Sequence, residues 1–205
     1  MLIPRLPSFL RLPYGTMVWR VPSAKKEVFL TFDDGPTPEI TEEVLSMLED
    51  YNFRATFFGI GKNVEAHPEI WERVKQAGHH VGHHTQNHVN GWKVDKTDYL
   101  EDVYQAADVV NSPLFRPPYG RISPRKAKVL SKKFKIIMWT IISGDYDQAI
   151  SAEQCALNVT KTLRPGDIIV FHDSVKAWPN LKDALPIVLK YIHEKGWVSE
   201  ALPMR

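Results

Sequence analysis

The sequence predicts an α/β protein built around a parallel sheet. Short apolar runs typical of buried strands alternate with longer segments whose apolar residues recur at helical spacing. About six or seven such strand–helix units follow one another, with no internal repeat between them. This order indicates a parallel sheet that either closes into a barrel or is doubly wound, with helices on both faces.

Each expected element rests on its own local pattern. Residues 28–32 are a continuous apolar run typical of a buried strand, and the helix expected over 38–51 places Val44, Leu45 and Leu48 on one face. The later strands are short apolar runs of the same kind, expected at residues 55–60, 79–82, 114–116, 135–141, 167–172 and 197–199.

The later helices are marked by their ends as well as by their periodicity. Gly78 is placed to end a helix over 64–77, and Asp95 is placed to cap a helix over 96–110. The remaining helices are expected over 124–133, 151–163 and 181–193, the last despite Pro186.

The composition is that of one globular domain. The chain has 205 residues, of which 43% are hydrophobic and 24% charged. We expect residues 1–26, rich in Pro and Arg, to form an irregular N-terminal leader packed on a single catalytic domain over 27–205. The net charge of +2 is too balanced to indicate nucleic-acid binding, and the basic residues between 125 and 135 are interpreted as the solvated face of a helix.

The cysteine content and the N-terminal sequence bear on location. Cys155 is the single cysteine, which excludes an intrachain disulfide and favours a small core residue over a nucleophile. Pro4, Pro7 and Pro13 interrupt the apolar run that a signal peptide needs, and no stretch approaches the length of a membrane span. The sequence therefore predicts a cytoplasmic protein, with an extracytoplasmic location as the alternative if an export signal is missing from the chain.

Polar residues that could carry chemistry gather directly after the expected strands. Ligand sites lie at the carboxyl ends of the strands both in β/α barrels and in open parallel sheets, so these residues are expected to share one site. They are Asp33, Asp34, His83, His84, His88, Arg116, Asp145 and His172.

Asp34, His84 and His88 are candidate metal ligands. The two histidines are four residues apart, a spacing that would place both on one face of a helical turn. Together with Asp34 they make a His, His, Asp set that leaves an open position for water at a zinc-type site and also suits other divalent ions. The turn could aim Asp34 at the ion and leave Asp33 free to take a proton. An ordinary Asp-Gly-Pro turn and a polar loop that happens to hold histidines are the alternatives.

Two further segments carry candidate catalytic groups. The loop that begins at Arg116 is stiffened by two prolines; Arg116 could hold Asp33 ionised, and the N–H of Tyr119 could face a developing oxyanion. His172 ends an apolar strand and is a candidate general acid because histidine titrates near neutrality, with Asp145 as the group that orients it. A rigid turn and a buried, hydrogen-bonded histidine are the alternatives.

These segments resemble the motifs of the polysaccharide deacetylases, carbohydrate esterase family 4, whose domain is also called the NodB homology domain. Residues 31–36 (Thr-Phe-Asp-Asp-Gly-Pro) resemble the first motif and residues 84–88 (His-Thr-Gln-Asn-His) the second. Residues 116–120 (Arg-Pro-Pro-Tyr-Gly) resemble the third, and residues 167–173 the fifth. The four segments stand in the family's order, which makes the combined match far more specific than any one of them.

The resemblance implies a distorted β/α barrel with about six or seven parallel strands, fewer than the eight of a regular barrel. It implies a divalent metal, most often zinc, held by Asp34, His84 and His88. By the same likeness, the base is Asp33, paired with Arg116, and the acid is His172, paired with Asp145.

The fourth motif departs from the family pattern. Ile142 stands where the first Asp is expected, and Tyr146 stands where the family has Trp, whereas the second Asp is kept as Asp145. We expect this departure to affect substrate contacts and the tuning of His172 more than the metal site.

As a whole, the sequence predicts a metal-dependent hydrolase that removes the acetyl group of an N-acetylated sugar in a glycan and releases acetate. The alternatives are a related hydrolase of an O-acetyl ester, a formamide or a cyclic amide, a non-catalytic sugar-binding module, and a structural β/α domain. Trp92, Trp178 and Tyr146 lie in expected loops near the motifs, where they could stack on sugars or simply pack within the loops. The sequence names neither the glycan nor the oligomeric state.

Overall fold

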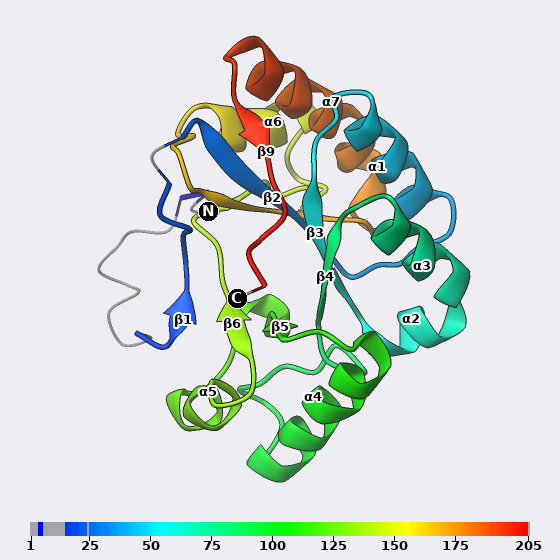
Figure 1. Ribbon diagram of the computed structural model, residues 1–205, viewed down its shortest axis with the longest axis vertical. Helices are drawn as coiled ribbons and strands as arrows, with labels where there is room; N and C mark the ends of the chain where they lie inside the picture. The colour runs from blue at the N-terminus through cyan, green and yellow to red at the C-terminus, as the bar shows by residue number, and fades with distance from the viewer. Residues whose placement is uncertain (1–3, 6–14, 24, 205) are drawn as a thin grey trace.

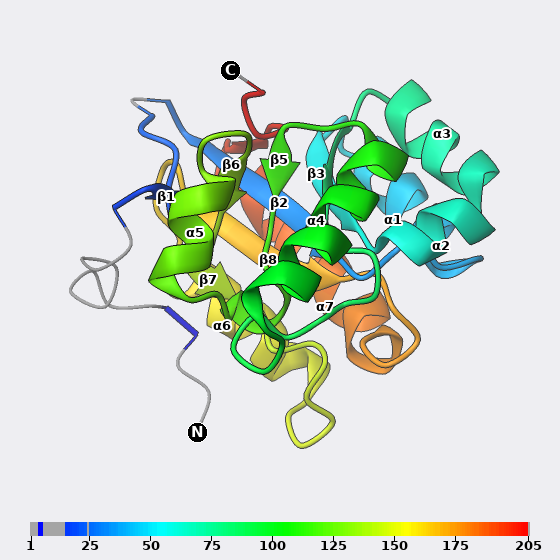
Figure 2. The same cartoon turned by 90° about the horizontal axis from the view of Figure 1, so that it is seen from below.

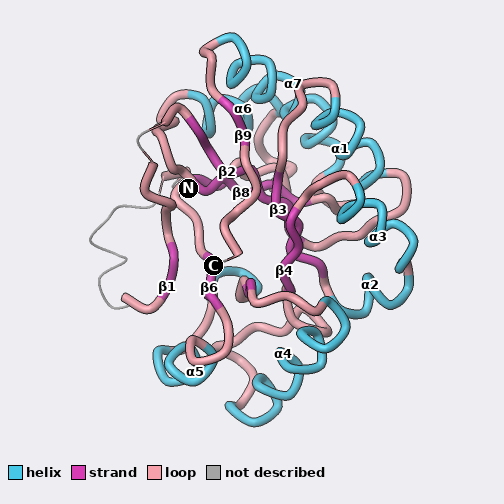
Figure 3. The backbone as a smooth tube through the Cα atoms, in the orientation of Figure 1, coloured by secondary structure: helices cyan, strands magenta, loops and turns pink. Residues whose placement is uncertain are grey.

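One curved parallel sheet forms the centre of the protein, and the helices lie around its outside (Figures 1 and 3). The computed structural model describes residues 4–5, 15–23 and 25–204. The strand order is β1-β6-β5-β4-β3-β2-β8-β7, with β9 paired to β2, and the paired strands run parallel. The predicted distorted β/α barrel is therefore confirmed.

The strands are short, apart from β2. They are β1 (Met17–Val18), β2 (Glu27–Asp33), β3 (Ala55–Gly59), β4 (His80–His83), β5 (Leu114–Phe115), β6 (Lys135–Ile137), β7 (Ile141–Ile142), β8 (Ile168–His172) and β9 (Val198–Ser199). The helices are α1 (Ile40–Glu49), α2 (Gly61–Ala66), α3 (Pro68–Gln76), α4 (Lys96–Val110), α5 (Pro124–Leu130), α6 (Ala152–Thr160) and α7 (Trp178–Glu194), with a short 3₁₀ turn, η2 (Pro118–Gly120).

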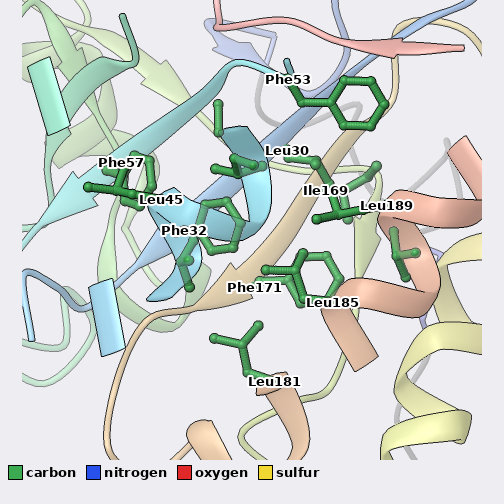
Figure 4. Packing of buried hydrophobic residues seen from close by; sticks show 14 of the residues in the cluster. Leu30, Phe32, Leu45, Phe53, Phe57, Ile169, Phe171, Leu181, Leu185 and Leu189 are labelled. Carbon is green, nitrogen blue, oxygen red and sulfur yellow. The ribbon is translucent and has the colours of Figure 1, made fainter. Parts of the chain in front are cut away.

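The largest core cluster lies between the central strands and the helices that cover them. Phe32 of β2 stacks on Phe57 of β3 and on Phe171 of β8, at ring-centroid distances of 5.0 and 6.0 Å. Leu185 and Leu189 of α7 belong to the same cluster, and Figure 4 shows them beside β8. In Figure 2, β2 and β8 cross the middle of the molecule, with α4 and α5 nearer to the viewer. This packing fixes the strand ends that carry the candidate site, because close-packed interiors tolerate little displacement.

Local signals account for several element boundaries. The side chain of Asp95 accepts a hydrogen bond from the Asp98 N–H at the start of α4, as predicted for a cap. Gly78, with φ of 81°, follows the end of α3. The single helix expected over 64–77 is wrong: it divides into α2 and α3 at His67, because the residue before a proline is disfavoured in the helical region and Pro68 starts a new helix.

The strand expected over 135–141 is also two strands. β6 pairs with β5 and β1, whereas β7 pairs with β8 at the other end of the sheet order. The apolar run was continuous, but the chain between β6 and β7 crosses from one end of the sheet to the other. Among the described residues no helix is both long and apolar enough to cross a bilayer.

The N-terminal segment is more regular than expected where the structure describes it. Met17–Val18 form β1, so the expectation of an irregular segment over all of 1–26 is wrong at these positions, whereas 1–3, 6–14 and 24 lie outside the described residues. Arg5 donates to both carboxylate oxygens of the buried Asp167, at 2.8 and 3.0 Å. The Ile142 N–H donates to the carbonyl of Pro4. These contacts hold residues 4–5 against β7 and the start of β8.

Two residues outside the candidate site bear on the sequence interpretation. Cys155 is fully buried in the main core cluster, which confirms the small core residue expected there. Lys126 is only 6% exposed, so the expectation of a solvated basic face is wrong at this position. Its ammonium group turns inward to backbone carbonyls instead of outward to water.

Candidate active site

The predicted polar residues converge at the carboxyl ends of the central strands. Asp33 and His172 end β2 and β8 and are directly paired in the ladder, and His84 follows β4. A cavity of about 220 Å³ opens at this edge of the sheet. Of the residues predicted from sequence, those that line it are Asp33, Asp34, His84, His88, Tyr119 and His172.

Asp34, His84 and His88 form a cluster of the size that one metal ion would bridge. Their potential ligand atoms all lie within 4.8 Å of one another. His88 Nε2 lies 3.3 Å and His84 Nε2 3.8 Å from Asp34 Oδ1. Burial alone would raise the pKa of Asp34, but the contact with His88 and the positive charge of His172 outweigh it and hold the pKa well below its usual range. Asp34 therefore stays ionised, as a ligand must.

The protonation of His84 also suits a metal ligand. Its Nδ1 lies 2.7 Å from the carbonyl oxygen of Arg116, and a carbonyl can only accept, so Nδ1 carries the proton. Burial, reinforced by His88, lowers the pKa of His84 to about 4, so the ring is neutral near pH 7. The lone pair is therefore left on Nε2, the atom that faces Asp34.

His84 and His88 are brought together by a loop. The helical turn expected from their spacing is absent, so that prediction is wrong. Thr85 and His88 have φ values of 63° and 55°, in the left-handed region that interrupts a right-handed helix. The side chain of Asp102 in α4 holds this loop by accepting from the N–H groups of Gln86 and Asn87 at 2.8 and 3.1 Å. Sequence reasoning missed Asp102, because its partners lie about 15 residues away along the chain.

Asp33 and Arg116 form a buried ion pair. Arg116 Nη1 donates to Asp33 Oδ1 at 2.7 Å, and neither side chain is more than 4% exposed. The guanidinium also donates to Thr31 Oγ1 and to the carbonyls of Ile137 and Met138, so its donors point to several fixed acceptors. Asp33 lines the cavity, whereas Arg116 lies behind it. The pair leaves a carboxylate at the cavity wall with its orientation fixed.

Asp145 and His172 form a second carboxylate–cation pair. His172 Nδ1 lies 2.8 Å from Asp145 Oδ1, and the His172 backbone N–H donates to Asp145 Oδ2. Burial would lower the pKa of His172, but the charge and hydrogen bond of Asp145 outweigh it and raise the pKa to about 9. Here the histidine lines the cavity and the carboxylate is buried behind it.

Sequence reasoning also missed Asp173, which supports the turn that carries Asp33 and Asp34. Its carboxylate accepts from the Gly35 N–H at 3.1 Å and from Thr41 Oγ1 at 2.6 Å. A Cβ on Gly35 would lie 2.0 Å from Asp173 Oδ2, so this approach requires glycine. The one sequence signal for a role of Asp173 was its position directly after His172, at the end of the strand-end motif.

The altered fourth motif lies at the cavity wall. Ile142 and Tyr146 both line the cavity, and the Tyr146 ring meets the His172 ring edge-on at a centroid distance of 5.2 Å. Tyr119 also lines the cavity, with its ring centroid 4.7 Å from that of His88. The structure thus brings most of the predicted residues together around one cavity: Asp33, Asp34, His84, His88, Arg116, Tyr119, Asp145 and His172. The expectation is wrong for His83, which ends β4 and packs its buried ring against Phe115 and Phe134. The catalytic roles stay predictions.

The segment over residues 20–134, which carries the Asp-Asp turn, the two histidines and the Arg116 loop, matches the family model for polysaccharide deacetylase. The chain belongs to the polysaccharide deacetylase family. It is 34% identical over 190 residues to a peptidoglycan-N-acetylglucosamine deacetylase of Bacillus cereus, covering 89% of this chain and 69% of that protein.

Solved structures of the deacetylase family share the fold. The Bc1960 peptidoglycan N-acetylglucosamine deacetylase superposes with a TM-score of 0.88 at 30% identity, covering 97% of this chain and 96% of that one. BA3943 of Bacillus anthracis, described as a pseudoenzyme of carbohydrate esterase family 4, superposes with a TM-score of 0.78 at 22% identity, covering 90% and 66%. Since this fold occurs in a pseudoenzyme as well, any claim of catalysis depends on the residues of the site.

Proposed function

We propose that this polysaccharide deacetylase family member is a metal-dependent hydrolase that removes the acetyl group from an N-acetylated amino sugar of a glycan. The proposal is carried by one observation: a possible metal cluster, a carboxylate paired with a buried guanidinium and an imidazole paired with a buried carboxylate border the same cavity. The peptidoglycan deacetylases among its relatives favour a substrate that contains N-acetylglucosamine.

The residues present suit a divalent ion, with zinc as the first expectation. Asp34 Oδ1 is buried and accepts no hydrogen bond of ordinary geometry from the described residues, although His88 Nε2 lies 3.3 Å away. A buried carboxylate oxygen without a donor is costly unless a cation meets it. Asp34, His84 and His88 would hold the ion, which would supply a Lewis acid for the acetamide oxygen and lower the pKa of water.

The two ion pairs supply the acid and the base. Asp33, paired with Arg116, would take the proton of the attacking water, and His172 would give its proton to the departing sugar amine. Bond breaking then leaves acetate and a free amino group. The N–H of Tyr119 is the candidate donor to the oxyanion that forms in between.

The decisive experiment measures acetate released from a panel of N-acetylated glycans, including chito-oligosaccharides and peptidoglycan fragments, before and after chelation. We expect release that the chelator abolishes and added Zn²⁺ or another divalent ion restores. His88→Ala serves as the matched variant, which should need far more metal for the same activity. Turnover that is insensitive to chelation would overturn the metal assignment. Turnover of a simple O-acetyl ester without any release from the glycans would favour the ester hydrolase instead.

A further inference from the structure

Trp92 is the most exposed aromatic side chain of the described residues, at 61%, and it lies close to the candidate metal ligands in the chain. It stands four residues after His88, at the tip of the loop that joins this histidine to α4. Val89 and Val94, on either side of the tip, pack against a buried cluster. The loop therefore anchors both of its ends in the core and presents its indole to solvent.

The loop that bears Trp92 is held rigidly. The Trp92 N–H donates to Asn90 Oδ1 at 3.0 Å, and the N–H groups of Lys93 and Val94 donate to the Asn90 carbonyl. Gly91 forms a bridge with Ile122, and a Cβ on Gly91 would lie 2.4 Å from the Arg121 carbonyl oxygen. The loop is thus attached to the segment that follows the Arg-Pro-Pro-Tyr-Gly motif.

A buried lysine completes the attachment. Lys126 Nζ donates to the carbonyls of Gly91, at 2.8 Å, and Val94, and it lies 4.9 Å from the Tyr99 ring centroid. Among the described residues no carboxylate pairs with this ammonium group, although it is almost fully buried. Burying an unpaired charge is unfavourable. The two carbonyls and the Tyr99 ring offset this cost in part, and through them Lys126 ties the loop that carries Trp92 to α5.

The indole does not line the cavity itself but is linked to it through the segment that carries Tyr119 and Arg121. The Tyr119 ring, which is 59% exposed, lies beside His88 and lines the cavity. Two residues further along, the Arg121 guanidinium lies 5.4 Å from the Trp92 ring centroid. Tyr119 and Trp92 are therefore exposed aromatic rings on two loops that are joined to each other beside the metal cluster.

We propose that Trp92 and Tyr119 form an accessory sugar-binding platform, which stacks on a pyranose ring of the same glycan outside the cavity. The C–H face of a pyranose is apolar, and an exposed indole held in place gains contact area there at little entropic cost. This inference rests on the proposed function and adds that Trp92 and Tyr119 bind at least one sugar of the glycan beyond the reacting one.

The test compares kcat/KM for the chito-oligosaccharide hexamer and dimer in the wild type and in Trp92→Ala. We expect the ratio of hexamer to dimer to fall about tenfold in the variant, through KM more than kcat, which corresponds to about 1.4 kcal/mol. Trp92→Phe should retain part of the ratio, because it keeps an aromatic face. Leu157→Ala, at an exposed apolar residue of α6, is the matched control and should keep the wild-type ratio.

An active Trp92→Ala enzyme with the wild-type ratio would overturn the platform while leaving the proposed function intact. If the wild type released no acetate, calorimetric titration with the hexamer would separate the two ideas. If the wild type bound the hexamer and Trp92→Ala weakened that binding about tenfold, the sugar-binding platform would be supported and the proposed hydrolysis would be overturned. No binding by the wild type would overturn both.

Discussion

The two ion pairs of the site are built from similar parts but present opposite members to the cavity. In the Asp33–Arg116 pair the carboxylate lines the cavity, and the cation is buried behind it. In the Asp145–His172 pair the cation lines the cavity and the carboxylate is buried. In each pair the hidden partner carries the charge opposite to that of the group at the cavity wall, and Asp33 and His172, the candidate base and the candidate acid, are neighbours in the β2–β8 ladder.

The pairs also differ in how the hidden partner is held. Arg116 cannot lose its proton in the ordinary pH range, and it is bound by Thr31 and by backbone carbonyls as well as by Asp33. Asp145 binds both the ring and the backbone N–H of His172. The cation of the first pair thus keeps its charge, whereas the cation of the second, His172, can titrate.

The largest effect is expected from Asp33→Asn, which keeps the shape of the side chain but removes the proposed base. Acetate release should fall by about 10²–10⁴-fold, while metal binding persists because Asp34, His84 and His88 are untouched. Steady-state rates together with measured metal content check this, with Asp183→Asn on the exposed face of α7 as control. A near-normal rate in Asp33→Asn would show that another group takes the proton.

Arg116→Met should reduce stability strongly, because it leaves Asp33 buried without its cation. A loss of about 3–5 kcal/mol in the free energy of unfolding is expected, measured by urea denaturation. The double variant Arg116→Met with Asp33→Asn should recover part of this loss, since no unpaired carboxylate remains. A double variant that is no more stable than the single one would show that the packing of Arg116, and not its charge, supports the turn.

Asp145→Asn should narrow the pH range of activity from the alkaline side. His172 must be protonated to act as an acid, so activity is lost as the pH rises through its pKa, which Asp145 raises to about 9. Without the carboxylate this pKa falls, and the alkaline limb of kcat/KM should move to lower pH by about 1–3 units. If the alkaline limb did not move, it would reflect the titration of a group other than His172.

The smallest of these effects is expected at Asp173, a buried carboxylate that does not line the cavity. Burial, with the charge of Asp34, raises the pKa of Asp173 to about 8. Asp173→Ala would leave the Gly35 N–H without its acceptor and should cost about 1–3 kcal/mol of unfolding free energy. Thermal unfolding checks the size of the loss. A change below the error of that measurement would mean that the turn carrying Asp33 and Asp34 is stable without the Asp173 side chain.

Sequence patterns predicted the parts of the fold that depend on neighbouring residues. The helix over 96–110 and its Asp95 cap are confirmed, because capping and periodicity are local. The break at His67 was missed although Pro68 signals it, and the split between β6 and β7 was missed because a continuous apolar run does not show which strands it will pair with.

The sequence by itself determined which residues meet, because strand order and strand ends place Asp33, His84, Arg116 and His172 at one edge of a parallel sheet. Only the tertiary structure decided which atom of each residue faces the cavity. The Arg116 carbonyl sets the proton of His84, Asp102 holds the histidine loop, and Lys126 turns inward. These outcomes depend on partners far away in the chain, and burial then decides which charges persist, so no local pattern could have specified them.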